Sequence, residues 1–226
     1  MNKLKKVKGF IEIVALIIFS FYYTEKIAIY VQNKTPLKKE IMSFKEKNKI
    51  DSINAVVDGE YIIPGIYGKI VNENKSYDAM KIYNVFNESK IVYDEIEPEL
   101  TVKDYPSKII RSGNKEKNAV SILIDKYSKN SDIFDEEKLK YTTINSTSYC
   151  IIINDDYNCN KGYKVKPLVL NNSNFLRNIN NIVPGTIIYI SDDLSENYVY
   201  LIIKHINFHN LNVLTLDDHL TEKNKL

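Results

Sequence analysis

AVSILI, residues 119–124, is a short run of apolar and β-branched residues interrupted only by Ser121, with polar turns on both sides. Such a run is typical of a strand that is buried on both faces of a parallel sheet. Strand-like and helix-like segments alternate from there to the C-terminus. Further strands are predicted at residues 148–153, 166–170, 184–190 and 212–216, and helices at residues 135–141, 172–180 and 195–209, with Asp217 capping a last turn. This alternation predicts an α/β fold around a parallel sheet.

The stretch that precedes this alternation has a different pattern. Asp58–Gly59 lies between two runs of β-branched and aromatic residues, which predicts a β-hairpin. Residues 76–86 have apolar side chains at helical spacing, with Ser76 or Asn74 available as the N-cap. Residues 90–102 are predicted to form a strand. These features together indicate a small α+β unit.

The N-terminus has the pattern of a membrane anchor. Four lysines precede an apolar run from Phe10 to Tyr23 that only Glu12 interrupts. Fourteen helical residues cover roughly 21 Å, less than the ~30 Å hydrocarbon core, but residues 28–31 extend the run to that length. A cleaved signal peptide is the alternative, because the run is short. We favour an uncleaved anchor, since no small-x-small cleavage site follows the run. The lysines then keep the N-terminus cytoplasmic and place the bulk of the chain outside.

Four segments are therefore expected along the chain. They are a cytoplasmic stub and transmembrane anchor at residues 1–31, a juxtamembrane stalk helix at 32–50, the α+β unit at 51–118 and the α/β domain at 119–226. For the second segment, a solvated linker is the alternative to a stalk helix.

Charge and cysteine content narrow the function. Residues 1–50 hold eleven lysines and four glutamates, which leaves a net charge of −5 for the rest of this +2 chain. A mildly acidic body argues against a nucleic-acid partner. Cys150 and Cys159 would lie in a non-reducing compartment and can form a disulfide. A buried free thiol is favoured for Cys150, because that residue lies within an apolar run.

Several stretches resemble the polysaccharide deacetylase family (carbohydrate esterase family four). NIVPGTIIYISDD, a helix and NLNVLTLDDHL, at residues 181–220, resemble the closing strands of that family's barrel. NAVSILIDK, residues 118–126, resembles its first strand. The stretches at residues 61–80 and 112–123 resemble the lead-in of a membrane-anchored branch. The resemblance implies a β/α barrel, but a full barrel takes about 200 residues, and residues 119–226 number 108. We therefore expect an incomplete, open barrel.

The resemblance also implies a set of catalytic positions. In this family a metal held by Asp and a His-x-x-x-His pair activates water, with an Asp base and a His acid. Asp125 falls at the position of the base, whereas Lys126 replaces the metal-binding Asp and Ser191 replaces the acid. Residues 126–149 contain no histidine. The chain therefore resembles a degenerate, truncated deacetylase, a pseudoenzyme with no metal or other cofactor.

His205 and His209 are the only histidines spaced to share a metal. They lie on the predicted helix at residues 195–209, whose Tyr198, Leu201, Ile202 and His205 are expected to face the sheet. Because this helix is far along the chain from the family's metal motif, we interpret the spacing as coincidental.

Three functions remain open from the sequence. The first is a non-catalytic, membrane-anchored, extracytoplasmic protein that binds cell-wall glycan or another envelope component. The second is a hydrolase with rearranged ligands, for which the histidine pair and five aspartates are candidates: Asp125, Asp155, Asp156, Asp192 and Asp193. Those aspartates that follow strands can instead cap the next helix. The third is a decayed remnant or a scaffold, with a protein partner covering the open sheet edge.

Overall fold

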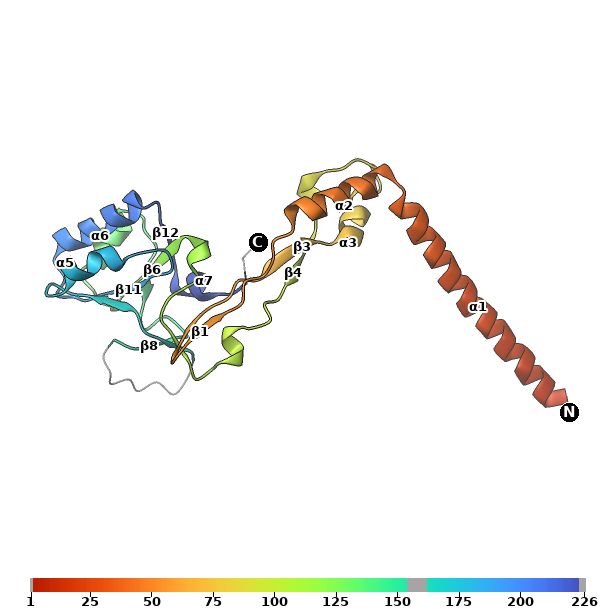
Figure 1. Ribbon diagram of the computed structural model, residues 1–226, viewed down its shortest axis with the longest axis horizontal. Coiled ribbons are helices and arrows are strands. Elements are labelled where there is room, and N and C mark those ends of the chain that lie inside the picture. Colours follow the sequence, from red (N-terminus) through yellow and green to blue (C-terminus); the bar gives the residue numbers. More distant parts are fainter. Residues whose placement is uncertain (1, 154–161, 224–226) are drawn as a thin grey trace. The chain divides into compact units, whose positions relative to one another are not determined.

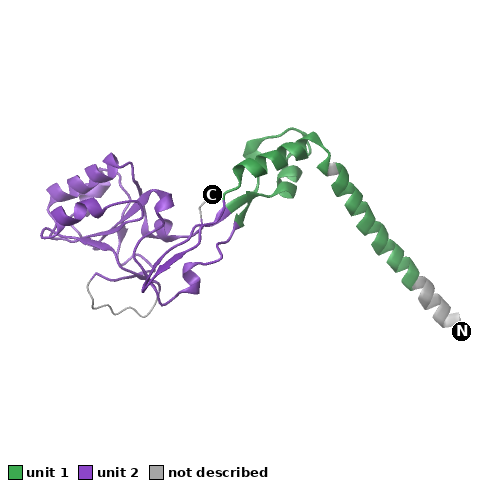
Figure 2. Cartoon of the chain, viewed as in Figure 1, with its two compact units in different colours: residues 1–50, 69–95 green, residues 51–68, 96–226 purple. Residues whose placement is uncertain are grey.

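The computed structural model describes residues 2–153 and 162–223, and the side chains of these residues from residue 11 onward except residue 32 (Figure 1). The chain divides into two compact units (Figure 2). Unit 1 comprises Met1–Ile50 and Lys69–Glu95, and unit 2 comprises Asp51–Gly68 and Ile96–Leu226. Residues 51–68 and 96–118 of the expected α+β segment therefore lie in unit 2, and its residues 69–95 lie in unit 1.

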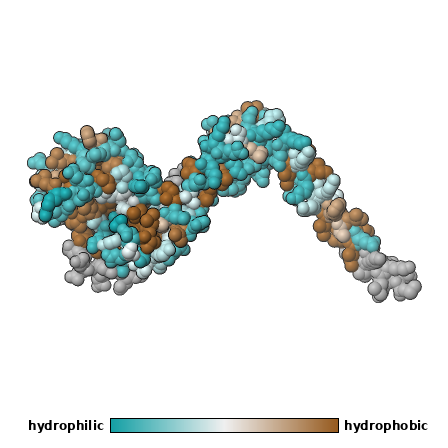
Figure 3. Space-filling model, in the orientation of Figure 1, coloured by the Kyte–Doolittle hydropathy of each residue, from teal (hydrophilic) through white to brown (hydrophobic). Residues whose placement is uncertain are grey.

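Unit 1 begins with a long helix. α1 (Asn2–Asn33) contains a 21-residue stretch, Ile11–Val31, with a mean hydropathy of 1.5 and none of it buried. Its length and composition suit a membrane span, and a signal sequence near an N-terminus has the same properties. Apolar residues are prominent on the surface of this helix (Figure 3).

The rest of unit 1 is a two-stranded sheet with two helices. Its elements are α2 (Pro36–Asn48), β3 (Gly68–Val71), α3 (Glu73–Met80), a 3₁₀ turn η1 (Glu88–Lys90) and β4 (Tyr93–Ile96). The helix expected after the anchor is therefore present as α2, and one face of it is buried. Its Leu37 and Ile41 share a small core with Val71 and Met80.

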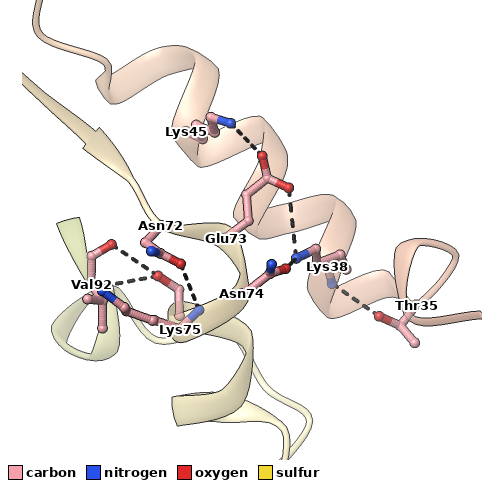
Figure 4. A network of polar contacts seen from close by, with 9 residues as sticks. Thr35, Lys38, Lys45, Asn72, Glu73, Asn74, Lys75 and Val92 are labelled. Carbon is pink, nitrogen blue, oxygen red and sulfur yellow. Dashed lines mark hydrogen bonds and ion pairs between the residues drawn. The ribbon is translucent and has the colours of Figure 1, made fainter. Parts of the chain in front are cut away.

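A polar network joins α2 to α3 (Figure 4). Lys38 is 2% exposed, and its Nζ donates to Asn74 Oδ1 at 2.9 Å and lies 3.8 Å from a Glu73 carboxylate oxygen. Lys45 reaches the same carboxylate. The N-cap of α3 is Asn72, whose Oδ1 accepts from the Lys75 amide. The prediction of Ser76 or Asn74 as the cap is wrong.

Unit 2 contains two sheets. The first has the order β1-β2-β5-β9-β8, and the second has the order β10-β11-β6-β12, with β7 also paired to β6. The first is built from β1 (Val56–Asp58), β2 (Tyr61–Ile63), β5 (Ile109–Ile110), β9 (Lys164–Val165) and β8 (Cys150–Ile151). The second is built from β10 (Leu168–Leu170), β11 (Ile187–Ile190), β6 (Ala119–Ile124), β12 (Asn212–Leu214) and β7 (Thr142–Thr143). All pairs are parallel except the β1–β2 hairpin, which was predicted at Asp58–Gly59.

The central strand β6 is buried on both faces, as expected. Ile122 and Ile124 pack into a core formed with the helices, whereas Leu123 packs into a second core formed with the first sheet. The second sheet is therefore a middle layer. The helices and 3₁₀ turns of unit 2 are α4 (Ser131–Glu136), α5 (Phe175–Asn178), α6 (Glu196–Phe208), α7 (Leu216–Leu220), η2 (Val102–Asp104), η3 (Lys115–Lys117) and η4 (Ile179–Asn181). The predicted α/β class is confirmed, and the sheets are not closed into one barrel within the described residues.

Three helix predictions need correction. α4 begins earlier and ends before residues 137–141, where Lys138 adopts a left-handed conformation that ends the helix. α7 is capped by Thr215, whose side chain accepts from the Asp218 amide, and not by Asp217. On α6, Leu201 is 44% exposed, because the buried face is formed by Val199, Ile202, Ile203 and Ile206.

Cys150 is also different from the favoured prediction. The residue is 3% exposed and disulfide-bonded. The chain's other cysteine, Cys159, lies outside the described residues. The preference for a free thiol at residue 150 is therefore wrong, because burial in an apolar run does not distinguish a thiol from half of a disulfide.

Candidate functional site

Asp125 and Tyr189 meet at the carboxyl end of the second sheet. Asp125 follows β6, Tyr189 lies on β11, and the two strands pair in parallel with Tyr189 opposite Leu123. The Tyr189 hydroxyl donates to Asp125 Oδ2 at 2.6 Å. Tyr189 is 6% exposed. Burial, followed by the hydrogen bond to this carboxylate, holds the pKa of Tyr189 well above its ordinary value. The phenol therefore keeps its proton and remains a donor to Asp125.

Polar residues next to this pair are more exposed. Lys126 is exposed, with its ammonium group 5.2 Å from the centre of the Tyr127 ring. Ser191 is half-buried, and its backbone N–H donates to the carbonyl oxygen of Leu170. Asp125 and Lys126 follow the end of β6, and Ser191 follows the end of β11, so all three lie at the carboxyl ends of two adjacent parallel strands.

Asp192 and Asp193 extend the acidic edge. Both are exposed, and both contribute to the raised pKa of Tyr189. The N-cap residue of α6 is Ser195, so neither aspartate caps that helix. Asp155 and Asp156, the other two candidate aspartates, lie outside the described residues.

The histidine pair lies at the opposite end of the same sheet. The rings of His205 and His209 are 4.4 Å apart, and His205 Nε2 is 3.0 Å from the backbone oxygen of Ile182. They line a pocket with residues that precede β6, β11 and β12, including Asn118 and Leu211. A six-residue strand spans roughly 17–20 Å, so Asp125 is far from both imidazoles.

The third histidine is one that sequence reasoning missed. His219 on α7 is completely buried, and its Nδ1 lies 3.1 Å from Ser121 Oγ of β6. Burial, helped by the nearby Lys117 charge, lowers the pKa of His219 to about 4. Lys117 donates to the backbone oxygens of Asp218, His219 and Thr221. The last carbonyls of a helix have no partner within the helix, and the Lys117 ammonium supplies one at the end of α7. No sequence signal marks this arrangement, because its members are about 100 residues apart.

A tyrosine-lined cavity of about 210 Å³ opens at the amino ends of β8 and β9. Tyr149 and Tyr163 directly precede these two paired strands and form part of its wall. Burial is the main cause that raises the pKa of Tyr149 to about 12, so its hydroxyl stays protonated. Glu222 also lines the cavity. The remaining surface is provided by Tyr67, Val102, Lys103, Ile110, Leu220, Thr221 and Lys223.

Glu222 holds three distant segments together at this cavity. Its Oε1 accepts from the backbone amides of Gly65 and Val102, both at 3.0 Å. Its backbone oxygen accepts from the Tyr67 amide at 2.8 Å. Since these partners come from opposite ends of the sequence, the cavity could not be found by spacing alone.

Solved structures share this architecture. BA3943 of Bacillus anthracis, described as a CE4 family pseudoenzyme, is matched at a TM-score of 0.53 and 16% identity, over 83% of this chain and 95% of that one. A BA3943 mutant with restored enzymatic activity is matched at a TM-score of 0.51 and 14% identity, over 83% and 98%. The chain has a polysaccharide deacetylase-like fold.

Sequence comparison finds one relative that matches a shorter part of the chain. The uncharacterized protein YlxY of Bacillus subtilis (strain 168) is 31% identical over 94 residues, which are 41% of this chain. The match spans 30% of that relative, so the chain covers less than a third of its length. No protein-family model matches the chain.

The deacetylase-like fold implies a metal, and the residues at the sheet edge do not fit one. Zinc and similar ions need three or more protein ligands with an open position. Among residues 2–153 and 162–223, no group of three His, Cys, Asp or Glu side chains converges. The Asp125 carboxylate accepts a hydrogen bond from a protonated phenol, and a lysine follows it in sequence.

Proposed function

We propose that the chain is a membrane-anchored, non-catalytic relative of the polysaccharide deacetylases that binds glycan in the cell envelope. The hydrogen bond from Tyr189 to Asp125 is the observation that supports the absence of catalysis in this proposal. A general base must accept a proton from the attacking water. Here one oxygen of the Asp125 carboxylate accepts from a buried phenol that keeps its proton at neutral pH, and the residue that follows is Lys126 and not a second carboxylate. The pseudoenzyme BA3943, which has the same fold, is consistent with this proposal.

Membrane anchoring rests on α1. Its 21-residue, mainly apolar stretch reaches the thickness of a bilayer, and lysines precede it in the sequence. The lysines would keep the N-terminus cytoplasmic and direct both units outside, where the disulfide at Cys150 is stable. Fractionation of cells that express the full chain tests this directly. Recovery in the membrane fraction after a carbonate wash is expected, and release into the medium as a shortened chain would instead identify a signal peptide.

Glycan binding is proposed for the tyrosine-lined cavity. Apolar ring faces stack against sugar rings, while phenol hydroxyls and a carboxylate oxygen bond to sugar hydroxyls. Tyr149, Tyr163 and Glu222 bring these groups together at one opening. Val102, Ile110 and Leu220 add apolar surface to the cavity, and such a mixture of apolar and polar groups suits a small ligand.

Co-sedimentation with purified cell-wall glycan tests the proposal. The full chain in nanodiscs is expected to sediment with the glycan. A double variant, Tyr149→Phe with Tyr163→Phe, removes two hydroxyls while keeping both rings and should weaken retention severalfold. Tyr200→Phe, on the 38% exposed tyrosine of α6, is the matched control and should bind normally. Absence of retention for the unaltered chain would refute glycan binding.

A working hydrolase is the second candidate. The observation in its favour is the acidic edge, where Asp192 and Asp193 lie close enough to affect the Tyr189 phenol beside Asp125. Release of acetate from an acetylated glycan, abolished both by a chelator and by Asp125→Asn, would establish this function in place of the non-catalytic one. A scaffold role is the third candidate, and co-purification of a protein partner from membranes without glycan retention would favour it.

A further inference from the structure

The loop that follows α3 in unit 1 exposes three large apolar side chains. Ile82, Tyr83 and Val85 are 82%, 72% and 66% exposed. Asn84, between them, adopts a left-handed conformation with a φ of 49°, which turns the chain sharply. Contiguous apolar exposure of this kind marks an interaction surface more often than chance.

The loop's flanks are firmly attached to the unit. Met80, immediately before it, is 1% exposed and shares the small core with Leu37 and Ile41 of α2. Phe86, immediately after the loop, packs against Phe44 of α2, and the centres of the two rings are 5.4 Å apart. Because both flanks are held, the three exposed side chains project from a supported turn.

The chain's connectivity places this loop next to the end of the apolar helix. α1 ends at Asn33, α2 begins at Pro36, and Leu37 is therefore four residues beyond α1. Consecutive residues span at most about 3.6 Å each, so Leu37 is within roughly 15 Å of that end. Met80 packs in the same small core as Leu37, and the exposed loop starts two residues later.

The loop repeats the side-chain chemistry at the outer end of α1. Lys90 Nζ lies 4.8 Å from the centre of the Tyr83 ring. On α1, the ammonium of Lys26 lies 5.3 Å from the centre of the Tyr22 ring, and the ammonium of Lys34, just after α1, lies 4.4 Å from the centre of the Tyr30 ring. Tyrosine rings with adjacent lysines are the amphipathic combination that suits the boundary between headgroups and acyl chains.

We infer that the loop from Ile82 to Val85 enters the lipid interface of the membrane that holds α1. This inference rests on the proposed anchoring and adds a second membrane contact to it. Ile82 and Val85 would lie among the upper acyl chains, with Tyr83 at headgroup depth beside Lys90. One helix alone leaves a domain free to tilt, whereas a helix and a nearby loop restrict the orientation of unit 1.

A single-tryptophan reporter tests the inference, because the chain contains no tryptophan. The full chain carrying Tyr83→Trp is reconstituted into nanodiscs of anionic phospholipid, with or without bromine on the upper acyl chain. Emission is expected to shift to the blue relative to free tryptophan, and brominated lipid is expected to quench it. Adding Ile82→Ser and Val85→Ser to this variant should reduce the quenching, since these exposed side chains are not needed for folding.

Tyr127→Trp is the reference, because Tyr127 is 85% exposed and also lies beside a lysine. Quenching at position 83 no greater than at position 127 overturns the inference. A blue shift that occurs only in native membranes, without quenching by brominated lipid, identifies a protein partner and also overturns it. Co-elution of the chain with nanodiscs reports anchoring separately, so failure of the anchor is distinguished from failure of the loop contact.

Discussion

Acidification should destabilise unit 2 through His219. The imidazole is completely buried, and its pKa is lowered from 6.5 to about 4, first by burial and then by Lys117. The unfolded chain therefore takes up a proton at a higher pH than the folded chain. Stability from the neutral ring is fully present above pH 6.5 and is lost as the pH falls toward 4. Between pH 7.5 and 4.5 the loss is about 2.5 kcal/mol, at 1.36 kcal/mol for each unit of pKa difference.

Urea unfolding of the full chain in detergent measures this loss, with tyrosine circular dichroism as the signal. Carboxylates also titrate near pH 4, so the comparison is with His219→Gln, whose side chain does not titrate. The substitution should lower stability at pH 7.5 but remove most of the histidine-dependent loss on acidification. Equal pH dependence in both proteins would refute the assignment of a depressed pKa to a neutral, buried His219.

Five further substitutions test the packing. Glu222→Ala should destabilise unit 2 by about 3 kcal/mol in the same urea assay, because two backbone donors lose a charged acceptor. Glu222→Gln keeps an acceptor and should cost about 1 kcal/mol. Gly113→Ala should cost about 2 kcal/mol, since a new Cβ would lie 2.3 Å from His219 Nε2. In unit 1, Lys38→Met should change stability by less than about 1 kcal/mol, whereas Glu73→Ala should cost more, because it leaves the buried ammonium without its carboxylate. Hydrogen exchange of α2 and α3 amides separates these two variants, and equal protection would contradict the prediction.

The local elements were largely predictable from residue patterns. β6 was visible because a strand buried on both faces needs apolar side chains at every position. The hairpin was visible because Gly59, with a φ of 57°, supplies the conformation that its turn needs. α6 was visible from its helical spacing, although its buried face was misassigned at Leu201. Where apolar residues surround a helix, periodicity does not select one face, and the neighbouring core does.

The candidate site was only partly predictable. Asp125 and Ser191 were singled out because short stretches around them resemble the deacetylase family. Tyr189 was missed as a partner, because it was interpreted only as part of an apolar strand. The Tyr149–Tyr163 cavity was missed because its lining residues come from distant segments of the chain that share no sequence pattern.

The sequence alone therefore determined which segments form strands and helices, and the apolar helix at the N-terminus. Each of these depends on side-chain type over a few neighbouring residues. Tertiary structure alone decided the division into two units, the burial of His219 and the hydrogen bond that occupies Asp125. Burial and proton affinity depend on atoms brought together from distant positions, and a one-dimensional pattern does not contain those distances.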